Sequence, residues 1–306
     1  MVKNYTVLFL IATFLFPKGM TAQEIQIFTL EDFDLKGNVK TSLVSTSYGK
    51  EEYEFNEEGL LTKSITRYND SDYDITLYKY SKGILLEKRL ENYRDNVIDK
   101  STSLASFYTI DSLLNLKITE KIVSYTKEFL DQYEYFYTAD SIFRIIHTNN
   151  SGIDETDISY TDVRGEQTKT YNLNGLIQKS IRTSVKKEKD SVVARNVLTK
   201  KFLDGEPSSA LEETFDGANK LVSATQFFHN ARSKQFAKAE TVTYFYDEKG
   251  MLLKTKSDKS GDVEEKEYVY QFDEKGNWIK EIIIPDNTYK TRSISYFERT
   301  EEAKQE

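Results

Sequence analysis

The sequence predicts an all-β protein, built as one long antiparallel up-and-down meander of repeated β-hairpins. Three observations lead to this prediction: aromatic residues alternate with polar ones in short runs, polar turn sequences follow these runs, and both recur together along the chain. A period of two residues is that of a strand with one buried face, and a repeat of a few tens of residues indicates a repeat architecture. The meander could form a curled single sheet or close into a large soluble barrel or shell.

The clearest unit begins at Tyr268. Tyr268, Tyr270 and Phe272 alternate with other residues, so they share one face of a strand. Asp273 then favours the first position of a type I turn, and Gly276 accepts the positive φ that follows. The chain returns as the second strand of a hairpin.

Seven further units resemble this one, and consecutive pre-turn aromatic residues are on average about 31 positions apart. The pre-turn aromatic residues are Phe55, Tyr80, Tyr108, Tyr137, Tyr171, Phe215, Tyr246 and Phe272. The residues expected to take a left-handed turn conformation are Gly59, Gly83, Gly175, Asn219, Gly250 and Gly276. The aromatic stripe has two interpretations, cross-strand packing or a platform for sugar rings, and the repeat itself favours packing.

The two ends of the chain differ in composition from this repeat domain, residues 23–306. Residues 1–22 are predicted to be a secretory signal peptide, with Lys3 before a short apolar run and Ala22 at a small-residue cleavage site. An uncleaved N-terminal anchor is the alternative. Residues from about 299 to 306 are expected to form a charged, flexible tail. The mature chain shows no apolar run of membrane-spanning length.

The segment between Tyr171 and Phe215 is longer than its neighbours, so we expect an extra strand there, Ser191–Leu203, between two turns. The side-chain parity of these strands is not fixed by the sequence. Lys179–Lys201 is locally basic: eight Lys and Arg residues accompany only two acids. This stretch could dock an acidic partner or a glycan, and a solvated face is the alternative that we favour.

The units together resemble the YD repeats of Rhs-type proteins, and the stretches 35–40 and 272–280 resemble exported YD-like repeat proteins of Bacteroidota. The resemblance covers nearly all of the mature chain. It implies an all-β shell or a porin-like soluble barrel, and it implies no particular function, because most such proteins have none assigned. Units with Ser where Gly is expected depart from the pattern in the middle of the chain.

Chemical motifs are not evident, so we assign no catalytic, cofactor or metal residue. There is no Cys, and His147 and His229 are the two imidazoles, which argues against a zinc or Cys–His site. The acidic turns could bind calcium, but the preference of Asp for turn positions explains these residues better. Asp-Ser-apolar triplets make three serines candidates for O-glycosylation, although turn preference explains two of them equally well: Ser112, Ser141 and Ser191.

The net charge of −8, with 42 basic and 50 acidic residues, argues against a nucleic-acid partner. We therefore expect an exported, non-enzymatic scaffold, in the periplasm, at the cell surface or secreted, that binds a glycan, peptide or protein. Two alternatives remain: a secreted glycan-active hydrolase that uses carboxylates, and an outer-membrane barrel. Charged residues within the expected strands, such as Lys63 and Glu265, argue against the barrel alternative. The oligomeric state is not predicted.

Overall fold

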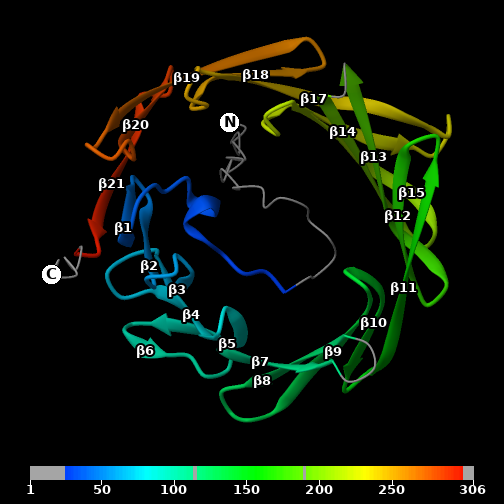
Figure 1. Cartoon of the computed structure of the whole chain (residues 1–306), viewed down its shortest axis with the longest axis horizontal. Helices are drawn as coiled ribbons and strands as arrows, with labels where there is room; N and C mark the ends of the chain where they lie inside the picture. Colours follow the sequence, from blue (N-terminus) through cyan, green and yellow to red (C-terminus); the bar gives the residue numbers. More distant parts are fainter. Residues whose placement is uncertain (1–24, 113–115, 189–190, 299–306) are drawn as a thin grey trace, which may run out of the picture.

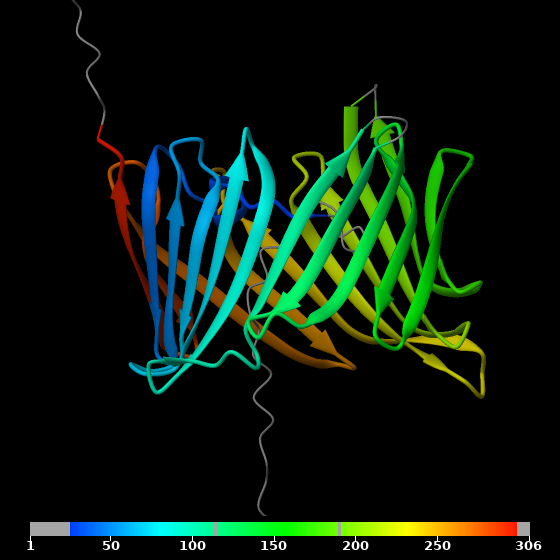
Figure 2. The same cartoon turned by 90° about the horizontal axis from the view of Figure 1, so that it is seen from below.

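The computed structural model describes residues 25–112, 116–188 and 191–298. In this part of the chain, twenty antiparallel strands form the wall of a closed barrel, and a two-residue strand, β6, is appended to β5 (Figures 1 and 2). Strands follow one another around the wall in chain order, so the meander prediction is confirmed, and the sheet is a closed barrel rather than an open one. The predicted signal peptide and C-terminal tail lie outside the described residues.

The elements have the following bounds: η1 Leu30–Phe33, β1 Val39–Thr46, β2 Gly49–Phe55, β3 Leu61–Arg67, β4 Tyr73–Ser81, β5 Ile84–Arg94, β6 Val97–Ile98, β7 Leu104–Asp111, β8 Lys117–Ser124, β9 Phe129–Thr138, β10 Ser141–Asn149, β11 Gly152–Val163, β12 Glu166–Leu173, β13 Leu176–Glu188, β14 Ser191–Leu203, β15 Glu206–Asp216, β16 Leu221–Asn230, β17 Gln235–Tyr246, β18 Leu252–Lys259, β19 Asp262–Phe272, β20 Trp278–Ile284 and β21 Thr288–Tyr296. The extra strand expected at Ser191–Leu203 is β14. The turn that follows it is shorter than the predicted 204–207, because Pro207 already lies within β15.

The barrel closes where the first strand meets the last. β1 pairs antiparallel with β21, for example Thr41 with Ser295 and Ser42 with Ile294. The Thr41 and Ser295 hydroxyl oxygens are 2.5 Å apart across this seam. In the described part of the chain, closure pairs both edges of the twenty-stranded wall, which removes the row of unpaired backbone groups that an open meander would expose.

The repeated unit has a defined local geometry. In six hairpins the pre-turn aromatic residue pairs with an apolar residue after the turn, and a β-bulge lies next to this pair. The pairs are Phe55–Leu61, Tyr80–Leu85, Tyr137–Ile142, Phe215–Leu221, Tyr246–Leu252 and Phe272–Trp278. A bulge adds twist and bends its strand, and repeated bulges therefore favour the curvature that closes a barrel.

One hairpin more than the aromatic pattern indicates lies between Tyr137 and Phe215. The terminal rim, defined as the barrel end where β1 begins and β21 ends, carries the turns of the six pairs above (upper rim in Figure 2). The turn at Gly175 joins β12 to β13 and lies on the opposite rim, so assigning Tyr171 to the same series was wrong. Phe55 and Phe272 are 217 positions apart and are separated by eight repeats of the hairpin unit, so the structural period is about 27 residues, not about 31.

The lumen-facing side of each strand is identified by the N-terminal segment, residues 25–38, which lies inside the barrel (Figure 1). Phe33 and Leu35 of this segment form a buried cluster with Val39, Phe55 and Leu61. Directly paired residues of antiparallel strands point to the same face, so the strand register extends this assignment around the wall.

Candidate binding site in the barrel lumen

The N-terminal segment is hydrogen-bonded to the inner wall near the terminal rim. The Leu30 amide donates to the Gly59 carbonyl at 3.0 Å, and the Leu61 amide donates to the Phe28 carbonyl at 2.9 Å. The Phe33 ring packs 4.5 Å from the ring of Tyr53, between centroids. The segment therefore occupies part of the lumen at this end of the barrel.

Asn277 fixes the other end of this segment. Its side chain is 1% exposed; its Oδ1 accepts from the Lys36 amide at 2.7 Å, and its Nδ2 donates to the Lys36 carbonyl at 3.0 Å. Arg292 lies over the Trp278 ring at 3.7 Å and donates to the Phe33 carbonyl at 3.3 Å. Burial lowers the pKa of Arg292 to about 10. The sequence predicts a turn that begins at Asp273, but nothing in it indicates that Asn277 anchors the N-terminal segment.

All eight residues of the predicted aromatic stripe face the lumen. Phe55, Tyr108 and Tyr171 are buried, whereas Phe272 is 44% exposed. Tyr80, Tyr137, Phe215 and Tyr246 are half-buried. The eight residues share the lumenal face but vary in packing, so neither packing nor a platform describes all of them.

Several lumenal tyrosines are tied to the neighbouring strand. The Tyr80 hydroxyl donates to the Leu61 carbonyl at 2.9 Å, and the Tyr246 hydroxyl donates to the Leu221 carbonyl at 2.7 Å. Burial raises the pKa of each of these phenols to about 12. These contacts stabilise the wall with neutral phenols.

The predicted turn residues lie in the left-handed region, with φ between 62° and 83°: Gly59, Gly83, Gly175, Asn219, Gly250 and Gly276. The turn between β9 and β10 differs from expectation. Ser141 begins β10, and Ala139 has the positive φ of 51°, because the chain reverses there in two residues. Ser112 and Ser141 are exposed; Ser191 begins β14, and its side chain lies outside the described residues.

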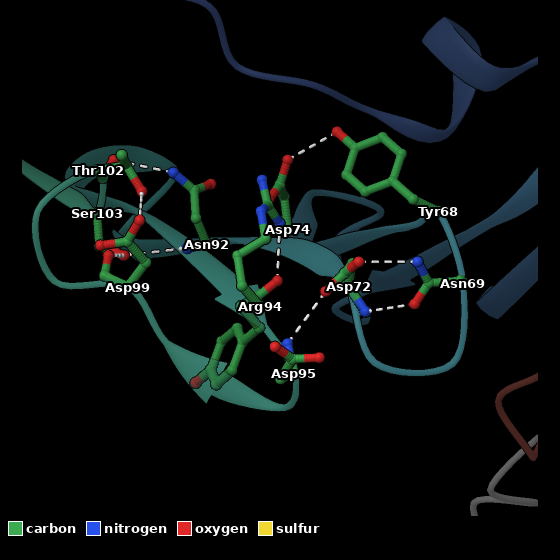
Figure 3. A network of polar contacts seen from close by, with 11 residues as sticks. Tyr68, Asn69, Asp72, Asp74, Asn92, Arg94, Asp95, Asp99, Thr102 and Ser103 are labelled. Atoms are coloured by element: carbon green, nitrogen blue, oxygen red, sulfur yellow. Dashed lines mark hydrogen bonds and ion pairs between the residues drawn. The ribbon is translucent and has the colours of Figure 1, made fainter.

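The acidic turns use their carboxylates for backbone hydrogen bonds. Asp273 Oδ1 accepts from the amides of Lys275 and Asn277, and Asp247 Oδ1 accepts from the Met251 amide. The loops after β3 and β5 behave in the same way: Asp72 accepts from the Asp95 amide and from an Asn69 side chain (Figure 3). Among the described residues, no group of three His, Cys, Asp or Glu side chains is placed to hold a metal ion.

The two histidines lie in different surroundings. His147 stacks on Tyr133, with 4.3 Å between ring centroids, and its Nε2 lies 2.6 Å from Asp131. His229 packs beside Phe236 at 5.3 Å. In the described part of the chain, His147 bonds to Asp131 and His229 packs on Phe236, and neither arrangement forms a Ser-His-Asp triad.

The outer wall carries cross-strand ion pairs. Arg67 lies 2.5 Å from Glu52, Lys63 lies 2.9 Å from Glu54, and Arg144 Nη2 lies 2.9 Å from an Asp157 oxygen. The register places all of these side chains on the face opposite to the lumen. In β2 the outward residues are Lys50, Glu52 and Glu54, and in β18 they are Lys254, Lys256 and Asp258. These strands present no apolar band to their surroundings.

The basic stretch 179–201 divides between the two faces of the wall. The register places Lys179, Arg195 and Lys201 in the lumen. Arg182 and Lys200 face outwards, so the solvated-face interpretation applies to them. Lys179 lies 4.2 Å from the centroid of the Tyr171 ring and directly opposite Lys201. The lumen therefore contains a basic, aromatic wall on β12–β14.

Within the described residues, no helix has the length and apolar character needed to cross a membrane. No family model and no curated protein matches the chain. The YD-repeat resemblance is therefore not established as family membership.

Solved structures resemble the chain at low similarity. A porin-like protein from Bacteroides uniformis matches with a TM-score of 0.33 and 11% identity, over 84% of this chain and 98% of that one. A porin-like protein from Bacteroides vulgatus matches with a TM-score of 0.26 and 8% identity, over 85% and 98%. A structure titled TcdB2-TccC3-TEV matches with a TM-score of 0.27 and 12% identity, over 86% of this chain and 15% of that one. At these values the function of the chain has to be argued from its own residues.

Proposed function

We propose that this chain is an exported, water-soluble β-barrel of the cell envelope or exterior that binds a partner in its lumen and catalyses no reaction. The observation that carries this proposal is the contrast between the two faces of the wall. The outer face bears cross-strand ion pairs such as Arg67–Glu52 beside single apolar residues such as Phe245, whereas the eight residues of the aromatic stripe, together with Lys179 and Lys201, face the lumen. A concave site lined by aromatic groups and a few charged ones is the usual form of a ligand site.

An outer-membrane barrel is the second candidate, because a closed barrel with an even number of antiparallel strands is the form that spans an outer membrane. The outer wall opposes it. A Lys or Arg on the lipid face at mid-membrane costs about 2–4 kcal/mol. β18 alone places Lys254 and Lys256 on its outer face, and Glu265 of β19 lies beside them.

A glycan-active hydrolase is the remaining alternative from another class. Such an enzyme needs two carboxyl groups that flank the substrate. The turn carboxylates of Asp247 and Asp273 accept backbone hydrogen bonds, which gives them a structural role. We expect no turnover on a polysaccharide panel.

The absence of Cys from the sequence allows a direct test of binding in the lumen. Val185 is 42% exposed and pairs with Arg195 on the lumenal face, whereas Asn196 is exposed on the outer face of the next strand. The variants Val185→Cys and Asn196→Cys each provide one thiol for a maleimide-linked polyethylene glycol. Each variant is purified without detergent and its monodispersity is checked. Its binding to a panel of glycans and peptides is then measured before and after labelling.

We expect both variants to be monodisperse without detergent, and labelling at 185 to abolish binding while labelling at 196 leaves it unchanged. A protein that is soluble only in detergent and conducts ions through liposomes would favour the outer-membrane barrel. Binding blocked by the label at 196 rather than at 185 would place the partner on the outer wall and contradict the proposal.

A further inference from the structure

A row of lumenal side chains crosses five strands near the rim opposite to the N-terminal segment. The register aligns Tyr171, Lys179, Lys201, Ser209 and Phe228 on β12, β13, β14, β15 and β16. With a strand spacing near 4.8 Å, the row is about 19 Å long. It is called the lysine row below.

Two ammonium groups lie at the centre of this row. Lys179 and Lys201 are directly opposite each other, a position at which like charges repel. Among the described residues, neither has a carboxylate within ion-pair distance. Two other lumenal lysines are ion-paired: Lys290 lies 3.0 Å from Glu281, and Lys266 lies 2.9 Å from Asp286. The charges of the row are therefore available to an anionic ligand.

An aromatic residue lies at each end of the row, and the two differ in solvent exposure. Tyr171 is 2% exposed and lies under Lys179, so it positions the ammonium group and offers no open face. Phe228 is 62% exposed, so its ring is accessible. Burial, together with Lys169 and Lys201, lowers the pKa of Lys179, which agrees with an ammonium group held among like charges.

We propose that the lysine row binds an acidic oligosaccharide, with its carboxylate or sulfate groups on Lys179 and Lys201 and a sugar ring against Phe228. This inference rests on the proposed lumenal binding function and names its ligand class. A sugar ring has an apolar face that packs on an aromatic ring, and its acidic substituent provides the charge. The row lies near the rim opposite to the one at which the N-terminal segment contacts Gly59, and the ring of Phe228 at its end is 62% exposed.

The test uses the mature chain, residues 23–306, with three oligosaccharides of matched length: oligogalacturonate, a chondroitin sulfate oligosaccharide and a neutral dextran oligosaccharide. Inorganic sulfate and polyglutamate serve as anionic probes without a sugar ring. Lys179→Gln and Lys201→Gln remove the charges, and Phe228→Ala removes the exposed ring. Lys200→Gln is the matched control, because it removes the same charge from the outer face of β14. Calorimetric titration gives each affinity.

We expect one or both acidic probes to bind and the neutral probe not to bind. Loss of a charge-assisted contact should weaken binding about tenfold or more in each lumenal lysine variant, and Lys200→Gln should bind like the native chain. Phe228→Ala should lower the affinity for the acidic oligosaccharide but leave the affinity for inorganic sulfate unchanged. Chondroitin sulfate carries carboxylates as well as sulfates, so similar affinities for the two acidic probes indicate a carboxylate ligand, and tighter binding of chondroitin sulfate indicates that the sulfate groups contribute.

Folding is checked separately in the absence of any ligand. Lys179→Gln and Lys201→Gln remove a repulsive pair, so their thermal midpoints should equal or exceed that of the native chain. Unchanged affinity of both lysine variants would overturn the inference, as would tighter binding of polyglutamate than of either acidic sugar. A neutral ligand that is excluded by labelling at residue 185 would overturn this inference alone and leave the proposed lumenal function intact.

Discussion

The turn after β19 allows backbone strain to be measured without steric interference. Gly276 has a φ of 79°, and a Cβ at this position would have only the Lys36 Nζ nearby, at 3.9 Å. A Cβ at Gly250 would instead lie 2.4 Å from the Lys220 Nζ. Substitutions at 276 therefore report the cost of a left-handed conformation in an L-residue.

The expected costs follow from the side chain introduced. Gly276→Ala should lower the free energy of unfolding by about 1–2 kcal/mol, the cost of the left-handed region for a residue with a Cβ. Gly276→Val should cost about 1–3 kcal/mol and more than Ala, since a branched Cβ is strained further there. Gly276→Asn should cost least, because Asn tolerates this region, as Asn219 does with a φ of 62° in the equivalent turn.

Urea unfolding of the variants, with unchanged slopes, gives the three differences. Glu274→Val is the control: it places the same side chain in the same turn, at an exposed residue without a positive φ. This control should stay within about 0.5 kcal/mol of the native chain. Equal stabilities of the Val and Asn variants at 276 would refute the argument from turn conformation.

Three further predictions concern the lumen. Phe55→Ala should lower the free energy of unfolding by about 3–5 kcal/mol, because Phe55 is 4% exposed, and Phe272→Ala should cost clearly less, because Phe272 is 44% exposed; chemical denaturation compares them, and equal costs would contradict the burial argument. Asn277→Ala leaves Lys36 without its two hydrogen bonds, so stability should fall by about 1–3 kcal/mol and hydrogen exchange in residues 28–38 should accelerate; unchanged exchange would show that Asn277 is not an anchor. Burial raises the pKa of Tyr246 from 10.0 to about 12, so the stability that its neutral phenol contributes is present below pH 10 and is lost as the pH rises to about 12; ultraviolet titration should show this phenol ionising late or together with unfolding, and ionisation near pH 10 in the folded chain would contradict this.

The hairpin unit was predictable from sequence because its determinants are local. Alternating aromatic residues, Asp at the turn start and Gly276 or Asn219 at the turn end lie within a few residues of one another. Tyr160 precedes the turn at Arg164–Gly165, and its hydroxyl donates to the Ile142 carbonyl as Tyr80 does to Leu61, but it was not included in the predicted series. β13 contains no aromatic residue, so the hairpin of β13 and β14 has no such signal; one hairpin was missed and the period was overestimated. Closure of the sheet depends on strand number and on the bulges around the whole wall, which no local pattern records.

The lysine row was only half predictable. The sequence marked 179–201 as basic, but the face of each side chain depends on parity, and bulges after Lys186 and Lys201 shift the alternation. Phe228 could not be linked to Lys179 by sequence, because they are aligned by the register of β13–β16 and not by any motif. A search for basic residues on consecutive strands would be the one signal available.

The closure of the barrel is tested most directly by cross-linking its seam. Thr41 and Ser295 are Cα partners on β1 and β21, and paired residues lie within the Cα separation of a disulfide. The control pair, Thr225 and Thr241, has its hydroxyl oxygens 2.9 Å apart on the sequential strands β16 and β17, which any meander would pair. In the Cys-free background, we predict that Thr41→Cys/Ser295→Cys and Thr225→Cys/Thr241→Cys form intramolecular disulfides with similar yield under mild oxidation. A disulfide in the control pair alone would show an open sheet and contradict the closed barrel and its lumen.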